Sequence, residues 1–291
     1  HITDVMHKRF YGQNMEPPTL GTEQTVGRMT ADILRQFHQR YVVGRNMNIV
    51  VLGDIKNGED ILSQIIESAG SIPAGERAPR IPWKPEIKFS GTEVLEFDSP
   101  MVQPLTTIEV AYALPGEFNK TTAGVLTHVV GKRLFEEVRE QRGLVYSISA
   151  NNYGHPGTRY LVIQAKVNPH QLDEALQGID LGIERIRDGG LEADTIESLL
   201  LAYTPSHVMQ LRTNGWVANE LVERMVAEDL GKSREPFEEL RTFFTMTPKA
   251  IIDAATTYLS DDRLIQIVHS KGEPTTSMVA MDRVPYISSF F

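Results

Sequence analysis

Two distant stretches of the chain carry the same pattern of residues, and this repeat constrains the fold more than any other feature. MTADILRQFHQRYVVGRNMNIVVLGD begins at residue 29, and MTPKAIIDAATTYLSDDRLIQIVHSKG begins at residue 246. In each copy a Met-Thr pair opens a predicted helix. Thr30 and Thr247 are predicted to cap these helices, because a threonine hydroxyl can accept hydrogen bonds from first-turn amides.

Each copy then continues into a predicted strand. The helices end near Tyr41 and Tyr258, and a short polar turn follows. The strands are predicted at Asn48 to Leu52 in the first copy and at Leu264 to Val268 in the second. Because the separation is the size of one domain, we expect the tail of one domain followed by the whole of the next.

A proline-rich stretch marks the predicted boundary between these two parts. Pro73, Pro79, Pro82 and Pro85 lie close together in it. Prolines so closely spaced are incompatible with a helix and unfavourable in a central strand. Residues 1–80 are therefore predicted to end one domain, and residues 81–291 to form the following one.

The second part, residues 81–291, is predicted to contain a few strands followed mainly by helices. Strands are expected over 92–97, 105–114, 144–153 and 159–167, and helices over 58–69, 120–140, 169–187, 193–210 and 214–230. The strands over 144–153 and 159–167 are separated by the turn GHPG, which predicts an antiparallel hairpin. This order predicts the α+β class, with an antiparallel sheet and helices packed on one face.

Composition excludes several classes of function. The 291 residues include no cysteine, so disulfides, thiolate metal sites and cysteine nucleophiles are absent. A net charge of −9 disfavours nucleic acid as a partner. The longest apolar runs are far shorter than the roughly 20 residues that span a bilayer, so no membrane segment is predicted. Because the chain starts at His1, we expect a piece of a longer polypeptide, and the lack of cysteine slightly favours a periplasmic or secreted location.

The stretch RLFEEVREQRGLVYS, Arg133 to Ser147, places a cation and a phenol where a helix gives way to a strand. Arg139 lies near the predicted helix end, Gly143 breaks the helix, and Tyr146 falls in the strand. Taken alone, these residues have an ordinary interpretation. Arg139 would pair with a neighbouring glutamate on the helix surface, and Tyr146 would pack on a core.

No metal site is predicted within this chain. None of its eight histidines belongs to an HxxEH or HExxH motif. His170 with Asp173 comes nearest, but it lacks a second histidine and is expected at the exposed start of a helix.

The stretch 133–147 resembles the second-domain signature of the pitrilysin-type zinc peptidases, the M16 family, which includes insulin-degrading enzyme and the mitochondrial processing peptidase. Residues 29–54 resemble the segment that closes the first half of such proteins. The resemblance implies an M16-like (LuxS/processing-peptidase-like) domain repeat. It also implies a zinc ion held elsewhere by HxxEH, whose glutamate acts as general base, and an arginine and a tyrosine seven residues apart that reach it. Arg139 and Tyr146 match that pair.

The expected function is therefore that of the C-terminal, non-zinc portion of an M16-type zinc metalloendopeptidase. It would close the peptide chamber and present Arg139 and Tyr146 to a zinc site in an N-terminal half or a partner subunit. The expected ligand is a peptide, and neither nucleic acid nor membrane is expected as a partner. By itself the chain is expected to be inactive. The alternative is a catalytically dead M16-like structural or peptide-binding subunit.

Overall fold

The computed structural model describes residues 8–12, 21–79, 87, 89–114, 119–155, 158–188, 196–198, 200, 201, 209, 213–229 and 238–271. Most of the predicted helix over 193–210 and most of the proline-rich stretch after residue 79 fall outside these ranges, as does the chain from residue 272 on. The described part of that predicted helix, residues 196–198, 200, 201 and 209, is helical.

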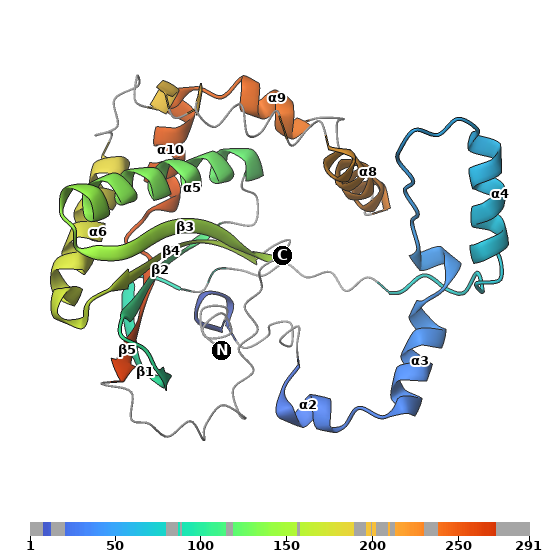
Figure 1. Ribbon diagram of the computed structural model, residues 1–291, viewed down its shortest axis with the longest axis horizontal. Coiled ribbons are helices and arrows are strands. Elements are labelled where there is room, and N and C mark those ends of the chain that lie inside the picture. The colour runs from blue at the N-terminus through green and yellow to red at the C-terminus, as the bar shows by residue number, and fades with distance from the viewer. Residues whose placement is uncertain are drawn as a thin grey trace.

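A five-stranded sheet lies in the left half of the molecule as viewed in Figure 1. Its strands are β1 (Thr92–Val102), β2 (Thr106–Leu114), β3 (Val145–His155), β4 (Thr158–Val167) and β5 (Arg263–Lys271). Their order across the sheet is β1-β5-β2-β4-β3, so β1 and β3 are the edges among the described strands. Neighbouring strands are antiparallel except for β1 and β5, which are parallel. The predicted hairpin is the β3–β4 pair.

Helices cover one face of this sheet (Figure 1). They are α5 (Lys120–Leu134), the π-helix η2 (Phe135–Gln141), α6 (Leu172–Arg187) with the short η3 (Pro169–Gln171) before it, α9 (Glu238–Phe244) and α10 (Pro248–Tyr258). Alternate residues of β2, among them Ile108, Val110 and Tyr112, belong to the core beneath them. The predicted α+β class, with helices packed on one face, is confirmed.

The other face of the sheet is covered by a short helical turn at residues 8–11. Phe10 is fully buried and Tyr11 nearly so, in a small cluster with Ala111, Tyr160 and Val162. The Tyr11 hydroxyl also donates a hydrogen bond to the main-chain oxygen of Arg159 at 2.8 Å.

A carboxyl group is buried on this face beside the apolar cluster. Glu109 of β2 is 8% exposed and accepts a hydrogen bond from Gln164 Nε2 of β4 at 2.8 Å. Burial raises the pKa of Glu109, and the hydrogen bond from Gln164 only partly offsets this. The folded chain therefore binds a proton at Glu109 more tightly than the unfolded chain does.

Replacing Glu109 with glutamine is expected to change how stability depends on pH. In the unfolded chain the carboxyl loses its proton at about pH 4.3. Since its folded pKa is higher, the wild-type free energy of unfolding falls as pH rises through the window between the two values. Glu109→Gln removes this loss, so its stability relative to wild type should rise between about pH 4 and pH 7. Urea unfolding at both pH values tests this, with Glu174→Gln on the exposed side of α6 as the control.

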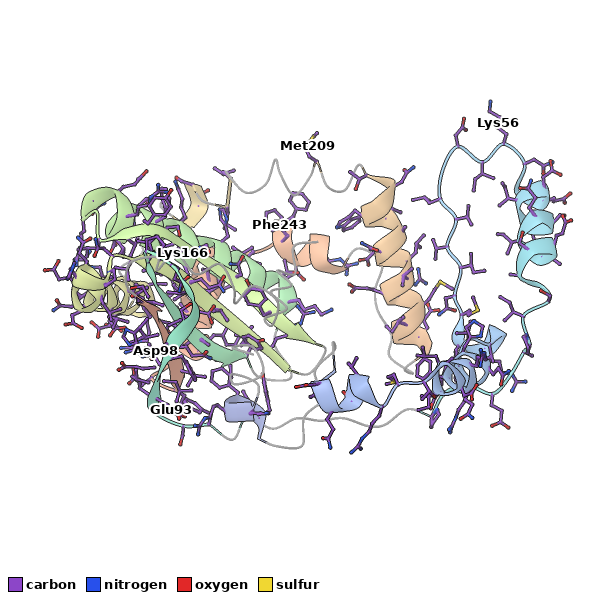
Figure 2. The ribbon with its side chains drawn as sticks, turned by 60° about the horizontal axis from the view of Figure 1, so that its bottom comes forward. Lys56, Glu93, Asp98, Lys166, Met209 and Phe243 are labelled. Atoms are coloured by element: carbon purple, nitrogen blue, oxygen red, sulfur yellow. The ribbon has the colours of Figure 1, made fainter. Side chains whose placement is uncertain are left out.

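The helices of residues 21–79 lie to one side of the sheet (Figure 1). They are α2 (Glu23–Gly27), α3 (Ala31–Tyr41), η1 (Gly44–Asn46) and α4 (Gly58–Ala69). Lys56, in the loop before α4, is far from the strands (Figure 2). The predicted strand at 48–52 is wrong for this structure, because these residues are not assigned to any strand. A strand needs a hydrogen-bonded neighbour, and the described sheet does not extend to this segment.

The two copies of the repeat differ in burial although their helices match. α3 and α10 are both 11 residues long, and Thr30 and Thr247 each accept a hydrogen bond from the third helical amide at 3.3 Å, as predicted. Ile251 of α10 is fully buried, whereas Leu34, at the same position in α3, is 58% exposed. Helix α3 thus carries a core-forming face that the described residues leave uncovered.

Candidate site at the end of the π-helix

The helix that carries Arg139 changes its winding before it ends. α5 is a regular α-helix up to Leu134, and the next seven residues form the π-helix η2. π-turns are rare, and they occur often at functional sites. Glu137, 7% exposed, fixes the inner side of this turn, with its Oε2 atom 3.2 Å from Arg185 Nη1 of α6. With Glu137 turned towards α6, Arg139 is left on the exposed side of the helix.

A glycine ends the helix, as the sequence predicts. Gly143 has a positive φ, in the left-handed region that favours glycine. Its amide donates to the main-chain oxygen of Arg139 at 3.0 Å, and the amide of Leu144 donates to that of Val138 at 3.0 Å. These bonds satisfy the last carbonyls of the helix and direct the chain into β3.

We expect Gly143→Ala to lower the free energy of unfolding by about 1–2 kcal/mol, because a side chain disfavours the left-handed conformation. No heavy atom lies within 4 Å of the position that the new Cβ would take, so backbone strain alone should account for the loss. Urea denaturation of the two proteins measures it. Gly124→Ala in α5 also has open space around the new Cβ but no positive φ, and it should not destabilise the protein.

Tyr146 occupies an irregularity at the start of β3. Val145 is paired with Val167 and Ser147 with Lys166, so Tyr146 is an extra residue, a β-bulge, in the β3–β4 ladder. Bulges re-aim side chains next to functional sites. Tyr146 is 69% exposed and is therefore not the packed core aromatic of the ordinary interpretation.

Arg139 is exposed too, and its guanidinium lies over the ring of Phe135 with Cζ 5.0 Å from the ring centroid. Glu136, a possible partner for it in the ordinary interpretation, instead pairs with Lys132 at 3.4 Å and Arg133 at 3.5 Å. A stacked guanidinium keeps its hydrogen-bond donors free at the ring's edge. The fold thus leaves both predicted site residues accessible, one on each side of the helix-to-strand turn.

The described residues contain no group of three histidine or acidic side chains arranged to hold a metal ion. His170 lies in η3, ahead of α6, where the sequence places it. The π-turn, the bulge and the Phe135 contact are features that sequence patterns do not predict. Among the residues that the structure describes, no helix has the length and apolar character needed to cross a membrane.

Comparison with known proteins identifies the family. The family model described as the peptidase M16 inactive domain matches residues 28–202, which is more than half of the chain. This chain belongs to that family. An uncharacterized zinc protease of Streptomyces coelicolor is 25% identical over 234 residues, covering 76% of this chain and 50% of that protein. The uncharacterized zinc protease YmxG of Bacillus subtilis is 25% identical over 210 residues, covering 68% of this chain and 48% of that protein.

The chain therefore spans about half the length of these relatives. Among solved structures, a peptidase M16 inactive domain from Pseudomonas fluorescens has a TM-score of 0.72 at 17% identity, covering 94% of this chain and 65% of that one. A chain of complex III2 from Candida albicans has a TM-score of 0.67 at 14% identity, covering 92% and 65%. At these identities the likeness shows the fold alone.

Proposed function

We propose that this chain is the accessory portion of an M16-type zinc metalloendopeptidase, which closes a peptide chamber and presents Arg139 and Tyr146 to a zinc site elsewhere. The observation that carries this proposal is the exposure of both side chains beside one helix-to-strand turn, inside a domain of the inactive M16 family. The zinc-bearing part would be an N-terminal half of the same polypeptide or a partner subunit.

Both side chains can stabilise the negative charge that develops on the carbonyl oxygen when a peptide bond is attacked. A phenol can donate a hydrogen bond to the oxyanion of a tetrahedral intermediate. A guanidinium can grip a peptide carbonyl or carboxylate through two donors. The zinc ion, when bound by its own domain, lowers the pKa of a water molecule to about 7 and polarises the scissile carbonyl. Arg139 and Tyr146 would then bind and orient the peptide.

Assays of this chain alone test the proposal. Its zinc content and its hydrolysis of unfolded peptides should both be at background. A second assay adds the zinc-bearing half, and turnover should then appear. Stoichiometric zinc together with turnover by this chain alone would contradict the proposal.

A structural or peptide-binding subunit without catalysis is the second candidate. The same fold occurs in a chain of complex III2, so a domain of this fold can be part of a larger assembly, and the fold by itself does not decide the function. The sequence encoded upstream, or by a neighbouring gene, separates the two candidates. An HxxEH motif there favours the peptidase, whereas its absence favours the binding role.

A further inference from the structure

The π-helix η2 and the residues that flank it pack directly against helix α6. Gly178 and Gly182 lie about one turn apart on α6, and both are buried. A Cβ atom at Gly182 would lie 2.5 Å from Cδ2 of Leu134, which precedes η2. A Cβ atom at Gly178 would lie 3.3 Å from Cδ1 of Leu144, which follows η2. Because these two positions carry no side chain, the backbone of α6 can approach both ends of the π-turn.

Glu137 joins the middle of η2 to the same helix. It is 7% exposed, and its Oε2 atom lies 3.2 Å from Nη1 of Arg185, three residues after Gly182 on α6. The side chain of Arg185 is itself 58% exposed. An ion pair with one partner in water contributes little to stability. A buried charge does, however, restrict which arrangements of the two helices are allowed, because its partner must stay within reach.

The winding of η2 decides where Arg139 lies on the helix surface. A π-turn contains one residue more than an α-turn, and each residue of an α-helix advances about 100° around the axis. If η2 relaxed to an α-helix, the residues after the extra one would rotate by about that angle relative to α5. Arg139 would then leave the exposed side on which the structure places it. The direction of its guanidinium therefore depends on whatever keeps the π-turn in place.

We propose that Glu137 and Arg185 are positioning residues, whose ion pair keeps the π-turn wound against α6 and thereby directs Arg139 towards the zinc site. This inference rests on the proposed function, since it explains how one of the two site residues is oriented. The close approach of α6 at Gly178 and Gly182 brings Arg185 within reach of Glu137. Neither partner of the pair is expected to touch the peptide.

Amide hydrogen exchange of this chain, followed by NMR, tests the structural half of the proposal. The amide of Gly143 donates to the main-chain oxygen of Arg139 at the end of η2. Glu137→Gln should speed its exchange by about fivefold or more, because a hydrogen bond between charged groups is stronger than one to a neutral amide. The exchange of Ile163, fully buried in β4, should stay as in wild type. Glu184→Gln, at an exposed position of α6, is the matched control and should change neither amide.

Turnover of the complete zinc enzyme tests whether the pair acts through Arg139. Glu137→Gln should lower kcat/KM about fivefold in wild type but less than about twofold in Arg139→Lys, because the guanidinium that the pair directs is then absent. Arg185→Gln should behave in the same way, whereas Arg185→Lys keeps the charge and should retain most of the activity. A merely structural role would give the same fall of kcat/KM in both backgrounds.

Three results would overturn the positioning role: unchanged exchange of Gly143 in Glu137→Gln, equal acceleration at Gly143 and Ile163, or an equal fall of kcat/KM in the two backgrounds. Thermal unfolding checks that the variants fold. Should Glu137→Gln fail to fold, Arg185→Gln changes the exposed partner and gives the same two readouts.

The proposed function stands or falls on a different measurement. It fails if Arg139→Lys and Tyr146→Phe leave turnover unchanged, and the exchange of Gly143 still reports whether the pair keeps the π-turn in place. If the pair alone fails, the effects of those two substitutions on turnover remain.

Discussion

Replacing Tyr146 with phenylalanine should lower kcat of the complete zinc enzyme by about 100- to 1,000-fold, with KM changed little. The phenol would donate to an oxygen that carries full negative charge only in the transition state, so its loss affects turnover more than peptide binding. Because Tyr146 is 69% exposed, removing its hydroxyl should leave the fold intact. Steady-state kinetics on one unfolded peptide, with this chain joined to its zinc-bearing half, measures the effect.

Arg139→Lys extends the same experiment. A lysine keeps the charge but loses the planar fork and the stacking on Phe135, so kcat/KM should fall by about tenfold or more. Tyr258→Phe in α10 serves as the control, since α10 packs on the helical face away from β3's exposed edge. If Tyr146→Phe and Arg139→Lys both leave kcat/KM within about twofold of wild type, the catalytic assignment is wrong.

The repeat provides the second large effect, measured on stability. Ile251 is fully buried, so its truncation leaves a cavity under α10. Ile251→Ala should therefore lower the free energy of unfolding by about 2–5 kcal/mol. Leu34, at the equivalent position of α3, is mostly exposed, and Leu34→Ala should have a much smaller effect in this chain, as exposed substitutions usually do. Urea denaturation of the two variants provides the comparison.

The two variants Ile251→Ala and Leu34→Ala also test the domain assignment. We propose that residues 1–80 end a preceding domain whose sheet would cover α3 and pair with residues 48–52. In a longer polypeptide that carries this domain, Leu34→Ala should cost about as much as Ile251→Ala does. If the cost in the longer polypeptide stays as small as in this chain, α3 is a surface helix and the boundary near residue 80 is misplaced.

Local signals allowed many of the helices and strands to be predicted. The helix over 58–69, the strand ending at Leu114 and the Thr30 and Thr247 caps were recognisable because capping residues and apolar periodicity act over a few neighbouring residues. The five-strand order was not, since it depends on contacts between distant segments, including the parallel pairing of β1 with β5. The strand predicted at 48–52 is wrong for the same reason: an apolar run alone does not make a strand, which also needs a hydrogen-bonded neighbour.

The candidate site, too, was only partly predictable from the sequence. The order Arg139, Gly143, Tyr146 was visible in the sequence, and the left-handed Gly143 is what a helix end before a strand requires. The π-turn and the bulge at Tyr146 were not visible, because each is a one-residue insertion that side-chain packing selects. The buried carboxyl of β2 left one trace, a glutamate at position 109 within the otherwise apolar run IEVAYAL. Its pairing with Gln266 depends on a strand near the other end of the chain.

The uncovered apolar face of α3 should affect how this polypeptide is handled in a cell. Leu34 and Phe37 expose 58% and 60% of their surface, and Ile66 of α4 exposes 60%. Chaperones and quality-control proteases triage chains that display such surface. A truncated or half-synthesised molecule would therefore carry its own degradation signal, and the preceding domain proposed above would remove that signal by covering these helices.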